Sequence, residues 1–210
     1  MSFLGILFPE RCFKCHRRGT SLCSSCEALL RLAQPLPNHT FAVYAYGEPL
    51  VQRAVWELKY HARGELARAL AQRAITHLLA YLEDYFQSGA PDRVVWVPIP
   101  EHTHKLRRKG FNQASLLASW WSQCIPGSST KNLLIKTRQT PPQARLNKTA
   151  RLKNVVNSMQ ARSLDPSWTY IVVDDVITTG ATCTEARRAL TARGATKIFF
   201  VALAHGYKRN

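Results

Sequence analysis

The most constraining feature of this chain is the segment 171–182, Ile-Val-Val-Asp-Asp-Val-Ile-Thr-Thr-Gly-Ala-Thr. Its β-branched residues predict a buried strand, and its glycine turn leads into a predicted helix over 180–193 that ends at Gly194. In open α/β sheets, ligands bind outside the carboxyl ends of the strands. The segment therefore predicts a strand, a turn and a helix that together build a ligand site.

The residue types around this turn suit a phosphorylated sugar. Asp174 and Asp175 would repel a phosphate, but they can accept hydrogen bonds from sugar hydroxyls or hold the Mg²⁺ of a pyrophosphate. Helix capping alone would explain one Asp or one Thr, not the whole set, and the segment has neither a dinucleotide-binding nor a Walker glycine pattern. The helix start offers backbone N–H groups and hydroxyls as an anion cradle, with the members Thr178, Thr179, Gly180, Ala181 and Thr182.

The rest of the chain predicts an α/β fold. Apolar runs predict strands over 40–46, 94–97 and 197–203, and helical spacing of apolar residues predicts helices over 50–60, 65–86 and 112–124. Strands that alternate with helices favour a mainly parallel sheet flanked by helices. Residues 126–164 are polar, basic and interrupted by prolines, which indicates a long loop with short helical pieces.

Length and composition limit the remaining possibilities. The 210 residues, 46% of them hydrophobic, suffice for one core and a small appendage. No stretch approaches the roughly 18 apolar residues of a membrane span, and the N-terminus does not read as an export signal. We therefore expect no membrane span and a cytoplasmic location.

Four cysteines form two tight pairs near the N-terminus: Cys12, Cys15, Cys23 and Cys26. Two C-x-x-C pairs can complete a tetrahedral shell of four sulfur atoms, which suits a structural zinc ion. Two redox-active pairs or an iron–sulfur cluster are the alternatives. The proline-broken connector 34–38 follows, so the sequence divides into a small metal module over 1–38 and a larger domain over 39–210.

The chain is strongly basic, with 29 Lys and Arg against 13 Asp and Glu and a formal net charge of +16. No acidic residue occurs between Glu101 and Asp165, although this stretch carries two basic clusters. A solvated surface is the ordinary fate of such residues, but clusters that flank an anion site favour polyanion binding. The residues singled out are Lys105, Arg107, Arg108 and Lys109 in the first cluster, and Arg145 and Lys148 in the second.

The segment 171–182 closely resembles the phosphoribosyl pyrophosphate signature of type I phosphoribosyltransferases. The cysteine pairs, the stretch 97–114 with Lys-Gly-Phe-Asn-Gln-Ala, and the stretch 140–154 with Thr-Pro-Pro-Gln-Ala-Arg-Leu narrow the resemblance to the ComF family, which is associated with competence and DNA uptake. The chain departs from the family at Lys109, where arginine is usual. Lysine keeps the charge but loses the bidentate fork.

The resemblance implies a type I phosphoribosyltransferase fold joined to a zinc-ribbon-like module. It implies that Asp174 and Asp175 are the catalytic residues and that they bind phosphoribosyl pyrophosphate together with residues 178–182. The first basic cluster would be the pyrophosphate loop, and the second would belong to a mobile lid.

Two functions remain open for this site. In the first, an enzyme transfers the phosphoribosyl group to an acceptor, with Mg²⁺ bound and the acceptor unidentified. In the second, a non-catalytic module binds nucleic acid or senses a nucleotide on the same fold; a protein scaffold is a third reading. The expected setting is natural transformation, with single-stranded DNA and a competence helicase or other DNA-processing proteins as partners.

Overall fold

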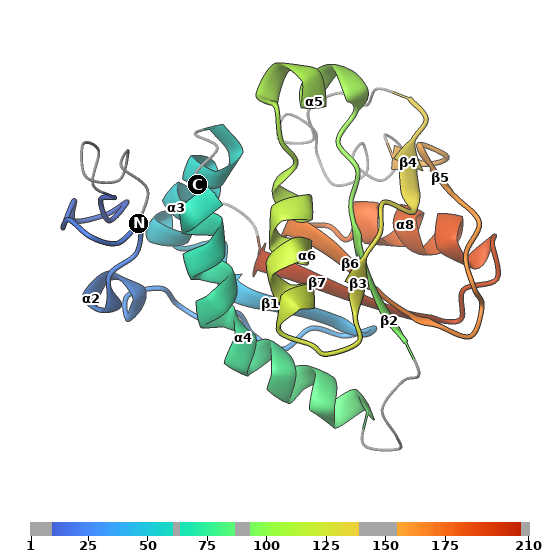
Figure 1. Ribbon diagram of the computed structural model, residues 1–210, viewed down its shortest axis with the longest axis horizontal. Helices are drawn as coiled ribbons and strands as arrows, with labels where there is room; N and C mark the ends of the chain where they lie inside the picture. The colour runs from blue at the N-terminus through green and yellow to red at the C-terminus, as the bar shows by residue number, and fades with distance from the viewer. Residues whose placement is uncertain (1–9, 61–63, 87–92, 139–154, 207–210) are drawn as a thin grey trace.

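The computed structural model describes residues 10–60, 64–86, 93–138 and 155–206 (Figure 1). Within these residues, five parallel strands form one sheet in the order β1-β7-β6-β2-β3. They are β1 (Thr40–Ala45), β2 (Val94–Pro98), β3 (Ser129–Thr130), β6 (Thr169–Ile177) and β7 (Lys197–His205). The helices are α2 (Ser24–Glu27), α3 (Pro49–Tyr60), α4 (Gly64–Phe86), α5 (Thr103–Lys109), α6 (Gln113–Gln123) and α8 (Ala181–Thr191). The predicted fold class, a mainly parallel sheet flanked by helices, is confirmed.

Helices cover both faces of the sheet, because the central strands bury side chains on both sides. Alternate residues of β6 enter two separate clusters: Ile171 and Val173 pack toward α3, α4 and α6, whereas Tyr170 and Val172 pack toward α8. Figure 1 shows α6 crossing in front of the sheet and α8 behind it. A strand buried on both faces reads as a continuous apolar run, which explains why the sequence revealed β2 and β6 so clearly.

The chain leaves β2 and β6 in opposite directions across the sheet. From β2 it passes through α5 and α6 to β3 at one edge, and from β6 it passes through α8 to β7 on the other side. The connections therefore diverge above the carboxyl ends of these two neighbouring strands. This divergence is a topological switch point, the place where open α/β sheets bind their ligands.

Two local features differ from what the sequence predicted. The described parts of residues 126–164 contain short strands that the sequence did not indicate, as well as a helical residue at Val155. The strands are β3, β4 (Leu134–Lys136) and β5 (Met159–Ala161), of which the last two pair antiparallel. Three-residue strands are too short to show a period, but Leu134, Met159 and Ala161 are buried beneath α8. The first basic cluster, expected as a loop, forms helix α5, which ends at Gly110 with the positive φ of 79° that favours glycine.

The N-terminal module packs on the same core as α3 and α4. Phe13 and Leu22 are buried in that cluster, and Glu27 pairs with Arg73 of α4 at 2.8 Å. The backbone N–H of Ala33 donates to a carbonyl of β1, which ties the connector to the edge of the sheet. The boundary at residue 38 stays a prediction. None of the helices in the described ranges has the length and apolar character of a membrane span.

The adjacent tryptophans of α6 give a test of this packing. Trp121 is fully buried, its Nε1–H donates to the carbonyl of Ala71 at 3.1 Å, and its ring lies 6.1 Å from that of Trp96. We expect Trp121→Ala to lower the free energy of unfolding by about 3–5 kcal/mol, because the cavity cannot close fully. Trp120→Ala, at a partly exposed position, should cost clearly less. Equal losses in urea denaturation would contradict this packing.

Candidate functional site

The site begins where β6 extends past the end of the neighbouring strand β2. The last paired residue of β2 is Pro98, which lies opposite Val173, while β6 continues beside β7 as far as Ile177. Asp174 and Asp175 therefore stand on a strand that has a neighbour on only one side. This offset leaves polar side chains and backbone groups accessible at the switch point.

The two aspartates face opposite sides of the sheet. Because side chains alternate along a strand, Asp175 follows Val173 toward α3, and Asp174 follows Val172 toward α8 and β4. The contact of Asp175 with α3 agrees, since the Nζ of Lys59 lies 3.1 Å from its Oδ2. Sequence reasoning treated the two carboxylates as one adjacent pair, whereas the structure gives each its own surroundings.

Lys59 is a site residue that the sequence did not indicate. It is the second-last residue of α3, and the amide of Gln113 holds this end of the helix by donating to the carbonyl of Lys59 at 3.1 Å. Burial disfavours the ammonium, but the adjacent Asp175 carboxylate holds the pKa of Lys59 above its ordinary value. A lysine at a helix end carries no local signal of function, because its partner lies more than a hundred residues away along the chain.

Asp174 is the carboxylate whose protonation the site controls most strongly. Burial and the negative charge of Asp175 raise the pKa of Asp174 to about 7, against the opposing effect of Lys59 and Lys136. The Asp175 N–H donates to the Oδ1 of Asp174 at 2.8 Å and orients it. Near neutral pH this carboxyl group gains or loses its proton readily, so its protonation depends on whether a cation or a hydroxyl group is bound to it.

Three further lysines contribute positive charge from two elements. Lys105 and Lys109 lie four residues apart on the partly buried side of α5, and Lys136 is at the end of β4. Burial lowers the pKa of Lys136, and Lys105 lowers it further; burial also lowers the pKa of Lys109, whose Nζ lies 3.9 Å from an Oε1 of Glu101. An anionic ligand would stabilise the charged form of lysines whose pKa is lowered in this way.

The structure thus separates the first basic cluster into two halves. Lys105 and Lys109 are partly buried and act electrostatically on the groups of the site, whereas Arg107 and Arg108 are exposed on the outer side of α5. The role of all four residues in binding pyrophosphate stays a prediction. The predicted lid residues Arg145 and Lys148 lie outside the described residues.

The turn after β6 carries the predicted anion cradle. Gly180 is the N-cap of α8 with a φ of 74°, a conformation that glycine adopts without strain. Gly180 has no side chain to cap the helix, but the Ala181 N–H donates to the Oγ1 of Thr179 at 3.3 Å. Thr178 and Thr182 flank the same turn. Burial raises the pKa of Cys183, in the first turn of α8, so it is a packed thiol and not a reactive one.

The four N-terminal cysteines converge as predicted. Their sulfur atoms all lie within 4.8 Å of one another, and those of Cys15 and Cys23 are 3.6 Å apart. Although burial opposes it, backbone hydrogen bonds lower the pKa of Cys12 to about 6, whereas burial and the neighbouring thiols raise the pKa of Cys26 to about 12. Four thiolates this close cannot all ionise without a cation. The group therefore fits a metal ion held by four sulfur atoms.

These features define the class of protein: an α/β protein with a five-stranded parallel sheet flanked by helices, and a four-cysteine group that fits a metal ion before its first strand. The chain is 30% identical over 200 residues to the DNA utilization protein YhgH of Salmonella typhimurium, covering 89% of this chain and 85% of that protein. This chain belongs to the ComF family. No family profile matched it.

Two other relatives carry competence names. Competence protein F of Haemophilus influenzae is 25% identical over 221 residues, covering 91% of this chain and 95% of that protein. Competence protein ComFC of Bacillus subtilis is 26% identical over 177 residues, covering 83% of this chain and 68% of that protein. The similarity therefore extends over most of this chain.

The raised pKa of Asp174 has a measurable consequence. An acid whose folded pKa exceeds its unfolded value of about 3.9 binds extra protons in the folded state, so its contribution to stability is full below pH 4 and is lost as pH rises through 7. At pH 8 we expect Asp174→Asn to have a free energy of unfolding roughly 1–4 kcal/mol higher than that of the wild type. The variant should therefore unfold at a higher temperature. The advantage should shrink toward pH 5.

The control for this prediction is Asp84→Asn, which removes a carboxylate from an exposed position of α4. Its unfolding curve should follow the wild type at both pH values. An Asp174→Asn variant that is less stable than the wild type at pH 8 would show that the carboxylate stabilises the fold and would contradict the assignment.

Proposed function

We propose that this protein binds phosphoribosyl pyrophosphate with Mg²⁺ at the carboxyl ends of β2 and β6. The observation that carries the proposal is the placement of Asp174, Asp175 and the start of α8 at one topological switch point. A helix start that follows a glycine N-cap suits a phosphate, and carboxylates beside it suit ribose hydroxyls. A plain polyanion site would gain nothing from two carboxylates.

The donor set also fits Mg²⁺. This ion prefers a few carboxylate oxygens together with substrate phosphate oxygens, and Asp174 gains most from a cation because its surroundings disfavour its charge. When bound, the ion would neutralise the pyrophosphate. The protein's own part is to orient the sugar through Asp174 and Asp175 and to receive the anion between α5 and α8.

In a transfer reaction the bond from the anomeric carbon to pyrophosphate breaks, and an acceptor nucleophile forms the new bond at that carbon. Negative charge then develops on the leaving group. Lys105, Lys109 and Lys136 lie around the carboxylates and are placed to stabilise this charge. Positioning and charge stabilisation suffice for such a step, so the site needs no nucleophilic side chain.

The biological setting that we propose is the uptake and use of DNA. The names of the relatives from Salmonella typhimurium, Haemophilus influenzae and Bacillus subtilis point to DNA utilization and competence. The net charge of +16 favours binding of a polyanion such as single-stranded DNA. Exposed arginines such as Arg107 and Arg108 are available to DNA phosphates without entering the sugar site.

The titration of the purified protein with phosphoribosyl pyrophosphate and Mg²⁺ tests the sugar site. At a ligand concentration of 100 times Kd, the melting temperature should rise by roughly 5–10 °C, because the ligand binds only the folded cradle. The double variant Asp174→Asn/Asp175→Asn should lose this shift but keep its affinity for single-stranded DNA, since Lys and Arg hold the DNA phosphates.

The variant Asp84→Asn, with an exposed carboxylate removed, should retain the full shift. Absence of sugar binding by calorimetry in the wild type would refute the proposed ligand and favour a nucleic-acid module. Sugar binding without pyrophosphate release in the presence of bases or amines would instead favour a nucleotide-sensing role.

For the four-cysteine group, we propose zinc. Freshly purified protein should contain about one zinc ion per chain by elemental analysis, and Cys12→Ser should reduce that content because Cys12 is one of the four converging thiols. Cys124→Ser, which changes an exposed cysteine outside the group, should leave the zinc content unchanged. Iron in place of zinc, or no metal in fresh protein, would contradict this assignment.

A further inference from the structure

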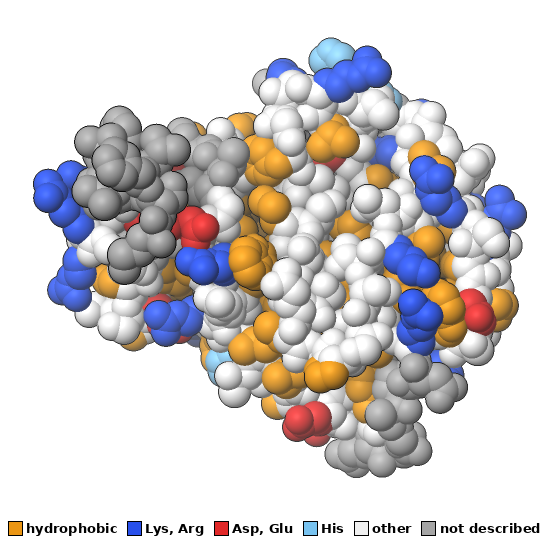
Figure 2. All heavy atoms as spheres, in the orientation of Figure 1, with side chains coloured by type: hydrophobic (Ala, Val, Ile, Leu, Met, Phe, Trp, Pro, Cys, Tyr) orange, Lys and Arg blue, Asp and Glu red, His pale blue; other side chains and the backbone are white. Residues whose placement is uncertain are grey.

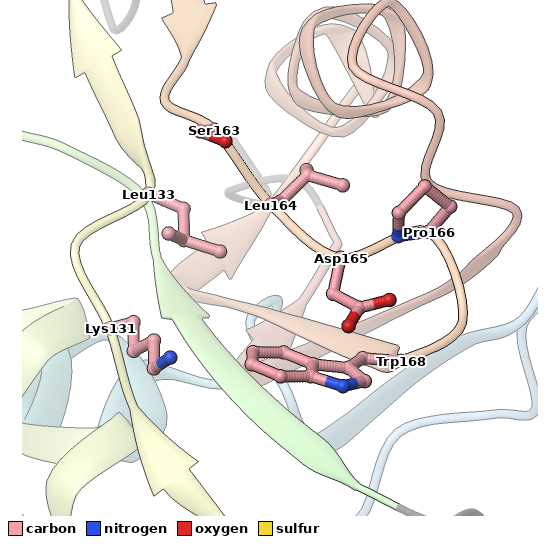
Figure 3. A pocket seen from close by; sticks show the side chains of 7 residues that line it. All are labelled: Lys131, Leu133, Ser163, Leu164, Asp165, Pro166 and Trp168. Carbon is pink, nitrogen blue, oxygen red and sulfur yellow. The ribbon is translucent and has the colours of Figure 1, made fainter.

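A pocket lies away from the switch point, at the edge of the sheet beside β3. It has a volume of about 520 Å³ and is lined by Lys131, Leu133, Ser163, Leu164, Asp165, Pro166 and Trp168 (Figure 3). Trp168 immediately precedes β6, whereas Asp174 lies six residues further along, roughly 20 Å away along an extended strand. The pocket is therefore separate from the sugar site.

The centre of this pocket is an indole with cations against it. The Nζ of Lys131 and the guanidinium carbon of Arg93 each lie 4.5 Å from the centroid of the Trp168 ring. Lys131 directly follows β3 and Arg93 directly precedes β2, so the two cations come from distant parts of the sequence. A cation over an aromatic ring is favourable by itself, but two of them bring like charges together around one partly exposed ring. An anionic ligand would relieve that repulsion.

The turn that carries Trp168 is rigid. The backbone N–H and hydroxyl of Ser167 donate to Oδ1 of Asp165 at 2.9 and 2.7 Å, and the buried Tyr170 hydroxyl donates to the Asp165 carbonyl at 2.7 Å. Pro166 packs against Gly194, where a Cβ would come within 3.1 Å of the proline ring. The pocket is thus held in shape before a ligand arrives, which lowers the entropic cost of binding.

The remaining lining residues limit the chemistry of the ligand. Figure 3 shows the Lys131 ammonium and the Asp165 carboxylate both directed toward the indole of Trp168, with Leu133 and Leu164 on the apolar side of the pocket. A bare phosphate would meet the Asp165 carboxylate and an apolar wall. A nucleotide uses every component: its base meets the aromatic and apolar surface, its amino or imide N–H donates to the carboxylate, and its phosphate meets the cations.

We propose that this pocket binds single-stranded nucleic acid, with one base against Trp168 and the neighbouring phosphates on Lys131 and Arg93. Figure 2 shows Lys and Arg side chains beside hydrophobic ones on this side of the molecule, and the exposed Arg162 follows directly after β5, with its N–H bonded to the Leu133 carbonyl. A basic surface with an aromatic platform is the arrangement that binds single strands without sequence preference. This inference rests on the proposed DNA role and is independent of sugar binding.

The test is fluorescence anisotropy with a labelled oligothymidylate of about 16 nucleotides, a length within the usual site sizes. Trp168→Ala should weaken binding by roughly tenfold or more, the effect of losing one stacked base. Trp120→Ala is the matched control, because this partly exposed indole also has a cation above it, Arg68 at 5.8 Å, but lies on the other face of the sheet. It should bind the oligonucleotide like the wild type.

A second pair of variants does not depend on the fold tolerating the loss of Trp168. Arg93→Gln/Lys131→Gln should reduce the slope of log affinity against log salt by about 1.4, as expected for two lost phosphate contacts on a single strand. Arg31→Gln/Arg53→Gln removes the same charge from exposed positions elsewhere and should leave the slope unchanged. Equal slopes in the two double variants, or equal affinities in the two tryptophan variants, would overturn the pocket assignment. No binding by the wild type would overturn the DNA role itself.

Discussion

The structure of this site depends on one offset between neighbouring strands. β6 continues past the end of β2, so the carboxylates of Asp174 and Asp175 lie beyond the last paired residue of β2. Charged groups at that position need compensation, because they are half-buried between helices on both faces. Lys59 supplies it for Asp175 at 3.1 Å. Asp174 has no cation this close among the described residues, and burial together with the charge of Asp175 raises its pKa. Ligand binding and local stability are therefore linked through the same two side chains.

The ion pair also connects the site to the N-terminal module. Lys59 lies in the last turn of α3, and α3 shares one hydrophobic cluster with α4 and with the buried residues around the cysteine group. Gln113 fixes the same helix end to the start of α6. The four-cysteine module is thus part of the packing that positions Lys59, so a metal ion bound there would be connected through the core to the carboxyl end of β6.

Two surfaces of different chemistry occupy opposite parts of β6. At its carboxyl end, carboxylates and partly buried lysines surround a helix start, an arrangement suited to a small, highly charged sugar phosphate. At its amino end, an indole, two cations and one carboxylate line an open pocket suited to a nucleotide within a strand. One continuous strand therefore separates the proposed sugar site from the proposed nucleic-acid site and fixes their spacing.

The sequence by itself determined the strands and helices with strong periodicity, the convergence of the four cysteines and the glycine turn at residues 178–182, because each of these is encoded locally by burial pattern or close spacing. Tertiary structure alone decided the rest. It placed Lys59 against Asp175, since that contact joins residues 116 positions apart. It divided the basic cluster of α5 into an inner and an outer side, and it assembled the Trp168 pocket from the segments 131–133 and 163–168. Contacts between distant segments depend on how the layers pack, and no local pattern of residues specifies that.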